Sequence, residues 1–329
     1  MTTTPLPYSR NADIRARQLA DNIEYVRRHI YALDDNTAAQ LLRMFQAAHG
    51  QLAALVGQNY YGGSGENGTW SATDAAFRQR TEMLLEQIRT QIKQLTSDAQ
   101  LLTFGAAQDA YRASYYGQAW LLDQSLRGGS GLNLSLLPTE AVRAAILNPY
   151  GGLTFVDRYA DARDLFVKDI RKAIIGSQIV GDSIPEAIKR LAESLGLNPD
   201  RKTWDRGLYS RLEMIARTEI LRASNNGTAA IYEQNKDVLS GWEFLTAKDD
   251  RVCEICAPED GKRYAFDDTA NQPPLHPNCR CDMAPVLQDQ ELEKKIVGER
   301  APFLVWARDN GITRDRYGNA YDFSGVTSI

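Results

Sequence analysis

Two short segments decide the fold of the C-terminal part of this chain: Cys253-Glu254-Ile255-Cys256 and His276-Pro277-Asn278-Cys279-Arg280-Cys281. Together they hold all four cysteines of the 329 residues and one of the three histidines. Zinc prefers thiolate and imidazole ligands, and it commonly takes its four ligands two at a time from two tight turns. Because no cysteine lies elsewhere, the clustering predicts a zinc site rather than scattered thiols.

The predicted site offers five candidate ligands for four positions. Cys253 and Cys256 bind the metal in either of two arrangements. In the first, His276 and Cys279 complete the set and Cys281 stays outside; in the second, Cys279 and Cys281 bind and His276 orients a neighbouring ligand. The spacing leaves both arrangements open. Four protein ligands predict a structural zinc, because catalysis needs an open position for water.

Disulfides or idle thiols are the alternatives to zinc. The polar start, Met1-Thr2-Thr3-Thr4-Pro5, lacks the basic and apolar stretches of a signal peptide, so we expect folding in a reducing cytoplasm, which disfavours disulfides. No run approaches the roughly 20 apolar residues that span a bilayer. The net charge of −4 does not favour a protein that coats nucleic acid.

Most of the chain before the cysteines is predicted to be helical. Apolar residues recur every three or four positions through 77–95, and the pattern predicts further helices over 41–55 and 99–124. We interpret the glycine-rich stretches 62–65 and 128–131 as flexible connectors.

A second set of helices follows in the sequence. Pro138-Thr139-Glu140 opens a short helix that ends at Asn148–Gly152. The spacing of Ser183 and Glu186 is that of a capping box at a helix start. A long helix is expected from about Asp205 to Asp237.

After Gly241 the pattern changes to short strands and loops. Trp242, Phe244 and Leu245 predict one strand, and 261–264 predict a turn into a second. This part has few large apolar residues, and a structural zinc, worth roughly 10–16 kcal/mol in small zinc-finger peptides, would hold it together.

The fold class is therefore predicted to be mainly α, with multi-helix N-terminal and central regions and a small zinc-stapled α+β lobe near the C-terminus. We call residues 241–287 the lobe. The predicted division is a helical N-terminal region with glycine-rich connectors over 1–150, a central helical part over 151–240, the lobe, and a C-terminal arm over 288–329. The arm is expected to begin with a short helix over Glu291–Arg300 and to contain a turn at 314–319.

A carboxylate on the long helix is the second notable feature. Glu219 is in phase with Ala216, Ile220 and Ala223, so it is expected on or beside the packed face, where a charge must be paired. Arg222, one turn on, can supply the partner. A polar clasp between helices, or onto the lobe, is the favoured interpretation, and a ligand or partner site is the alternative.

His276 also raises the question of catalysis. Zinc-stapled nucleases need a second histidine or asparagine pair around a divalent metal, whereas His29 and His49 lie in predicted helices of the first half. Residues 248–282 hold five Lys/Arg against eight Asp/Glu, which opposes binding to phosphates. We predict no catalytic and no organic-cofactor residues.

Several motifs between residues 165 and 287 are shared with a known family. They are Arg217-Thr218-Glu219, Trp242, Asp249-Asp250-Arg251-Val252-Cys253 with Cys256, Asp260-Gly261-Lys262, and Pro274-Leu275-His276-Pro277-Asn278-Cys279-Arg280-Cys281. Together they resemble the phage Mu F-like head-morphogenesis proteins, which are minor head proteins of tailed bacteriophages. The run from Pro274 to Cys281 is the most specific part. The first 150 residues and the tail after Val286 carry no motif of the family.

The resemblance implies a non-enzymatic, low-copy head component, associated with the portal vertex and acting in head assembly or genome delivery. It implies a location in the virion, with the host cytoplasm as the site of assembly. The implied partners are the portal and other head proteins, with packaged DNA as a further candidate and without a membrane or a small-molecule substrate. The alternatives are a metal-dependent nuclease or hydrolase of packaging, and a DNA-contacting ejection protein.

Overall fold

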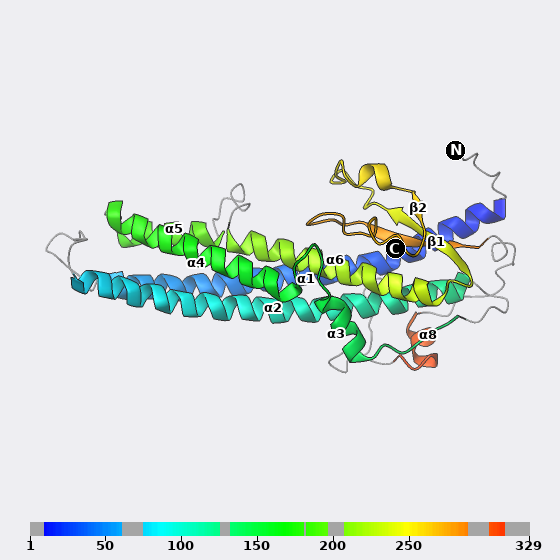
Figure 1. The fold of residues 1–329 in the computed structure, drawn as a ribbon, viewed down its shortest axis with the longest axis horizontal. Helices are drawn as coiled ribbons and strands as arrows, with labels where there is room; N and C mark the ends of the chain where they lie inside the picture. Colours follow the sequence, from blue (N-terminus) through cyan, green and yellow to red (C-terminus); the bar gives the residue numbers. More distant parts are fainter. Residues whose placement is uncertain are drawn as a thin grey trace. The chain divides into compact units, whose positions relative to one another are not determined.

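The computed structural model describes residues 10–60, 75–125, 132–180, 182–196, 207–288 and 303–312. Within these ranges the chain is mainly helical with one small sheet, as predicted (Figure 1). The helices are α1 (Arg10–Tyr60), α2 (Ala75–Ser125), α3 (Thr139–Leu147), α4 (Phe155–Val180), α5 (Ile184–Leu195), α6 (Leu208–Gln234) and α8 (Phe303–Asp309). The strands are β1 (Leu239–Leu245), β2 (Arg263–Tyr264) and β3 (Asp282–Leu287), and a 3₁₀ turn, η3, spans Ala257–Glu259.

Two predicted helices are one continuous helix in the structure. The patterns at 77–95 and 99–124 both belong to α2, which passes through the polar positions between them without a break. At that point the buried Thr96 hydroxyl donates to the carbonyl of Ile92, 2.9 Å away, so the polar group is satisfied inside the helix. The glycine-rich stretches 62–65 and 128–131 lie outside the described residues.

The chain divides into two compact units, each built from separate segments. One, here the helical unit, comprises Asp35–Gly105 and Leu147–Arg217. The other, here the mixed unit, comprises Met1–Asp34, Ala106–Ile146 and Thr218–Ile329.

The helical unit is held by apolar helix faces. Residues of α1, α2, α4 and α5 recur at intervals of three and four and lose almost all solvent exposure. Burying one such side chain fully is worth about 1.5–3 kcal/mol. Prominent members are Phe45, Leu52, Ile88, Ile92, Phe155, Tyr159, Phe166, Ile170 and Leu191.

Helix α5 shows how local signals fix the ends of a helix. The backbone amide of Ser183 donates to Glu186 Oε2 at 2.7 Å, as a capping box requires. Hydrogen bonds from Ser183 lower the pKa of Glu186. Gly196 ends the helix at φ 75°, a left-handed conformation that favours glycine. A Cβ on Gly207 would lie 2.2 Å from the Gly196 Cα, so this close approach also needs glycine.

The mixed unit contains a three-stranded antiparallel sheet in the order β2-β1-β3. Trp242 of the central strand pairs with Tyr264 on one side and Pro285 on the other. The first two strands confirm the predicted ones. The third was not predicted, because Pro285 argues against a central strand; β3 lies at the edge, where a missing amide donor is tolerated.

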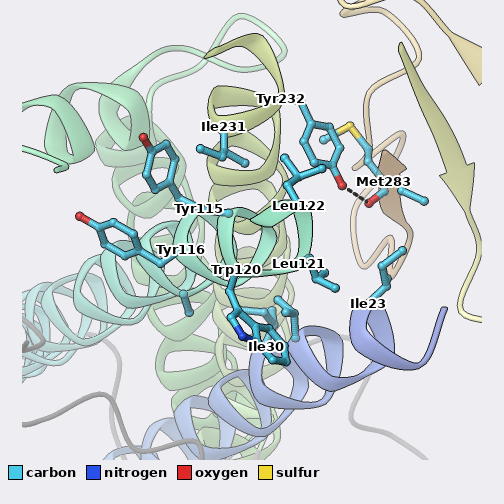
Figure 2. Packing of buried hydrophobic residues seen from close by; sticks show 14 of the residues in the cluster. Ile23, Ile30, Tyr115, Tyr116, Trp120, Leu121, Leu122, Ile231, Tyr232 and Met283 are labelled. Carbon is cyan, nitrogen blue, oxygen red and sulfur yellow. Dashed lines mark hydrogen bonds between the residues drawn. The ribbon is translucent and has the colours of Figure 1, made fainter. Parts of the chain in front are cut away.

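The core of the mixed unit joins α1, α2, α6 and the sheet (Figure 2). Ile23 and Ile30 of α1 are in the same cluster as Trp120 of α2. The Tyr232 hydroxyl lies 3.3 Å from the carbonyl oxygen of Met283, which fastens α6 to β3 (Figure 2). The sulfur-bearing residues Cys256, Cys279 and Cys281 belong to this cluster as well, so the predicted metal ligands border a packed core.

A further helix near the C-terminus also packs into this core. Phe303 of α8 meets Trp120 edge to face with ring centroids 6.0 Å apart, and Trp306 donates to Asp123 Oδ2 at 2.9 Å. This helix was not predicted, and the expected helix over Glu291–Arg300 and turn at 314–319 lie outside the described residues. Over the part of the chain that the structure covers, no helix combines the length and the apolar character that crossing a bilayer requires.

Candidate metal centre

The first cysteine pair lies on a tight turn that aims backbone amides at sulfur. The amides of Cys256 and Ala257 donate to the Cys253 carbonyl oxygen at 3.2 and 2.9 Å, which closes the turn. The Cys256 amide also approaches the Cys253 sulfur at 3.4 Å. Although burial acts in the opposite direction, hydrogen bonds from Cys256 and from the Ile255 amide lower the pKa of Cys253, as a thiolate ligand requires.

The second segment is a turn that brings His276 and Cys279 to the same side. The Cys279 amide donates to the His276 carbonyl oxygen at 3.1 Å. Asn278 takes a left-handed conformation with φ 60°, which asparagine tolerates better than most residues. Cys281 follows two residues later and immediately precedes β3.

The structure brings all five candidate ligands together in two overlapping groups. Cys253, Cys256 and His276 form one group, and Cys256, Cys279 and Cys281 form the other; within each group the ligand atoms lie within 4.8 Å of one another. This arrangement can hold a metal ion, and Cys256 is common to both groups.

Short distances run through Cys256, which links the two groups. His276 Nε2 lies 3.0 Å from Cys253 Sγ and 3.2 Å from Cys256 Sγ, and Cys256 Sγ lies 3.7 Å from Cys279 Sγ. Around a tetrahedral zinc with Zn–S near 2.3 Å, ligand atoms are spaced about 3.5–3.8 Å apart. The sulfur pair matches this spacing and the two sulfur–nitrogen distances are slightly shorter.

The second nitrogen of His276 is also fixed. Its Nδ1 lies 2.7 Å from the Pro277 carbonyl oxygen, which can only accept, so Nδ1 carries the proton. The lone pair of Nε2 then faces the sulfurs of Cys253 and Cys256. A backbone carbonyl on the far nitrogen is the usual way in which a metal-binding histidine is oriented.

The burial and the pKa shifts of three thiols show why this site favours a bound cation. Cys256, Cys279 and Cys281 are 2, 1 and 5% exposed. Hydrogen bonding with Cys281 lowers the pKa of Cys279 to about 5, burial raises the pKa of Cys256 to about 12, and hydrogen bonding with Cys279 raises the pKa of Cys281. One thiolate beside two neutral thiols is favoured, because buried like charges repel. A divalent cation would compensate several thiolates together, so the donor set fits a metal ion.

An ion pair links the two cysteine segments on the outside. The Arg280 guanidinium contacts both carboxylate oxygens of Asp249, one at 2.7 Å, in a bidentate arrangement. Hydrogen bonding to Arg280 holds the pKa of Asp249 well below its usual value. The turn before the first cysteine is thereby joined to the residue between the last two.

Helix α6 holds the second cysteine segment from the inside. The Asn278 amide donates to Thr218 Oγ1 at 3.1 Å. The side chain of Asn225 donates to the carbonyl oxygens of Leu221 and Cys281, at 3.0 and 3.2 Å. The motif containing Thr218 is therefore in direct contact with the cysteine segment.

The predicted clasp around Glu219 is present, and it joins two helices. Glu219 and Arg222 are 1 and 6% exposed in the side chain, and their closest N–O distance is 2.8 Å. Arg222 Nη2 also donates to the Ile146 carbonyl oxygen at the end of α3, 2.6 Å away. The pairing compensates the two buried charges, as the sequence predicted.

Two residues at the edge of the site were not predicted from the sequence. Arg27 and Tyr31 of α1 contact the carbonyl oxygens of Thr246 and Arg280, at 3.0 and 2.8 Å. Their only local signal is an arginine on the apolar face of an amphipathic helix, next to Ile23, Val26 and Ile30. That signal marks a buried polar contact without naming the partner.

The family comparison covers this site. Residues 168–284 match the family model described as Phage Mu protein F like protein, which confirms the resemblance over that segment. The matched segment runs from α4 into β3 and includes α6 and all five candidate ligands. No curated protein and no solved structure matches the chain.

Proposed function

We propose, from the Mu F-like family that residues 168–284 identify, that this chain is a minor head protein of a tailed bacteriophage, acting in head morphogenesis. The observation that carries the proposal is the overlap of the family match with the whole cysteine site and with the helix that supports it. A role in assembly calls for a surface of fixed shape rather than for an open catalytic position. A closed metal site supplies such rigidity.

The metal in this proposal is a structural zinc bound by Cys253, Cys256, His276 and Cys279. Support comes from the short distances of His276 Nε2 to the sulfurs of Cys253 and Cys256, from that between the sulfurs of Cys256 and Cys279, and from the orientation of the imidazole. Cys281 then remains a buried thiol beside the site. Metal analysis of the purified chain tests the assignment: one zinc per chain is expected, and a metal-free chain that retains its full fold would contradict it.

The proposed partners are the portal and other head proteins, with the loop 257–278 as the part of the lobe presented to them. We place the protein in the virion, at the portal vertex, in a low and fixed number of copies. Quantitative mass spectrometry of gradient-purified particles tests this placement. A constant low copy number in portal-containing heads is expected, and absence from both empty and filled particles would overturn the structural role.

A packaging nuclease is the principal rival, with His276 as its base. The contacts of His276 favour the structural role, because one nitrogen faces two sulfurs and the other donates to a carbonyl oxygen. The rival predicts metal-dependent DNA cleavage that His276→Ala abolishes while the chain stays folded. We expect no such cleavage from the wild-type chain. Salt-sensitive DNA binding would instead support an ejection protein.

A further inference from the structure

A chain of hydrogen bonds runs from the end of the central strand to the second cysteine segment, through α1. Arg27 Nη2 donates to the Thr246 carbonyl oxygen at 3.0 Å and to the Tyr31 hydroxyl at 3.1 Å. The Tyr31 hydroxyl in turn donates to the Arg280 carbonyl oxygen at 2.8 Å. We call Arg27 and Tyr31 the α1 clamp. It joins two points of the chain that lie on either side of the first cysteine pair.

The α1 clamp is buried, which makes its geometry specific. Arg27 is only 7% exposed, and its guanidinium lies 5.7 Å from the centre of the Tyr31 ring. A buried guanidinium is costly unless hydrogen bonds compensate it, and here Nη2 donates both to Thr246 and to Tyr31. The opposing carboxyl of Asp282 lies close enough to interact with the charge.

The clamp acts on a segment that α6 also holds at both ends. Thr218 accepts from the Asn278 amide, and Asn225 donates to the Cys281 carbonyl oxygen, both from α6. The Tyr31 hydroxyl donates to the Arg280 carbonyl oxygen, which lies between these two points of the segment. Helices from distant parts of the sequence thus hold three positions of a four-residue segment that carries Cys279, a proposed metal ligand. Sites of this kind need their ligands held to within about half an ångström.

We propose that Arg27 and Tyr31 are positioning residues of the metal centre, so that the N-terminal helix, outside the family-matched segment, completes the site. The inference rests on the proposed zinc site. Partners that support metal ligands typically change metal affinity 10–100-fold when removed. Tyr31 acts through the backbone next to a ligand, so Tyr31→Phe is expected to speed zinc release by about tenfold, the lower end of that range.

The experiment compares two variants that each lose one phenolic hydroxyl. Tyr31→Phe removes the contact with Arg280, whereas Tyr115→Phe removes the contacts of another mixed-unit tyrosine with Ser135 and Gln234, away from the cysteines. Zinc release into excess chelator is followed in both, along with the absorption of the cobalt-substituted proteins and thermal unfolding. Arg27→Met, which keeps a similar volume but removes both hydrogen bonds of Nη2, provides a second test of the clamp.

Faster zinc release and an altered cobalt spectrum in Tyr31→Phe, but not in Tyr115→Phe, is the expected result. Equal release rates in wild type and Tyr31→Phe, or equal acceleration in both variants, would overturn the proposal. Hydrogen exchange over 276–283 in the metal-free chain separates this failure from a failure of the zinc assignment. If wild type binds no zinc, faster exchange in Tyr31→Phe alone still supports the clamp, and unchanged exchange refutes it.

Discussion

The lobe and the helical unit keep their folds by different means. In the helical unit, long helices bury continuous apolar faces, with Phe45, Ile88 and Ile170 among the residues that lose nearly all exposure. The lobe has one central strand between two edge strands, packs Trp242, Phe244 and Met283 into the mixed-unit core, and carries its polar contacts at the periphery. Its two cysteine segments are joined by thiol and imidazole contacts and by the Asp249–Arg280 pair.

The difference shows that the stability of a segment depends on how much apolar surface it can bury. Helix faces repeated over 26 residues, as in α4, provide enough apolar area without any ion. A loop-rich segment of fewer than 50 residues does not, and below about that size metals or disulfides usually supply the rest. We therefore expect changes at the cysteines and changes in the helix faces to have separable effects.

The largest expected effect is loss of the lobe on removing its shared ligand. Cys256→Ser should abolish zinc binding and remove hydrogen-exchange protection from β1, β2 and β3, because a structural zinc is worth roughly 10–16 kcal/mol in small domains. Protection of α4 and α5 should persist. Metal analysis and exchange mass spectrometry measure both effects. Cys281→Ser is the matched control and should keep its zinc; retained zinc in Cys256→Ser would refute the assignment.

The next effect is confined to the helical unit. Ile170→Ala empties a site that is 2% exposed and should cost about 2–5 kcal/mol of unfolding free energy. Zinc content should not change. Leu165→Ala on the same helix, at a position 44% exposed, is the control and should have little effect. Comparable zinc loss in Ile170→Ala would mean that the two parts are not separable as described.

A smaller effect is expected at the ion pair between the cysteine segments. Asp249→Asn removes the charge but keeps one oxygen acceptor for Arg280, so the segments should stay joined more weakly. We expect modestly faster zinc release at neutral pH and a small fall in melting temperature. Asp250→Asn, at the neighbouring exposed position, serves as the control. Identical release from the two variants would show that the pair does not support the site.

The smallest effect concerns the start of α5 and depends on pH. Hydrogen bonds from Ser183 hold the pKa of Glu186 below its ordinary value of 4.5. The folded state therefore binds this proton less readily than the unfolded state, and the stabilisation is present above pH 4.5 and is lost as the pH falls through the lower, folded-state pKa. Wild type should exceed Glu186→Gln in stability at pH 7 and lose that advantage in acid. Thermal melts across this range measure the difference, and a constant difference at every pH would contradict the expectation.

The features that the sequence predicted have local signals. The cysteine spacing and the Ser183–Glu186 capping box are both decided within a few residues, and both appear where they were expected. Strand β3 could not be predicted because it contains Pro285. A proline fits an edge strand, and the edge position of β3 is defined only by the assembled sheet. The α1 clamp was hidden for a stronger reason: Arg27 and Tyr31 meet partners 219 and 249 residues away. No short-range pattern contains that information.

The distance along the chain between Tyr31 and Arg280 also sets an order of events during synthesis. At translation rates of about 5–20 residues per second, the 249 residues between them take roughly 12–50 s to make. Throughout that interval Tyr31 is without the carbonyl that it binds in the folded chain. The segment with the last two cysteines therefore brings late contacts for α1, which can complete its packing only after the ribosome has passed Arg280.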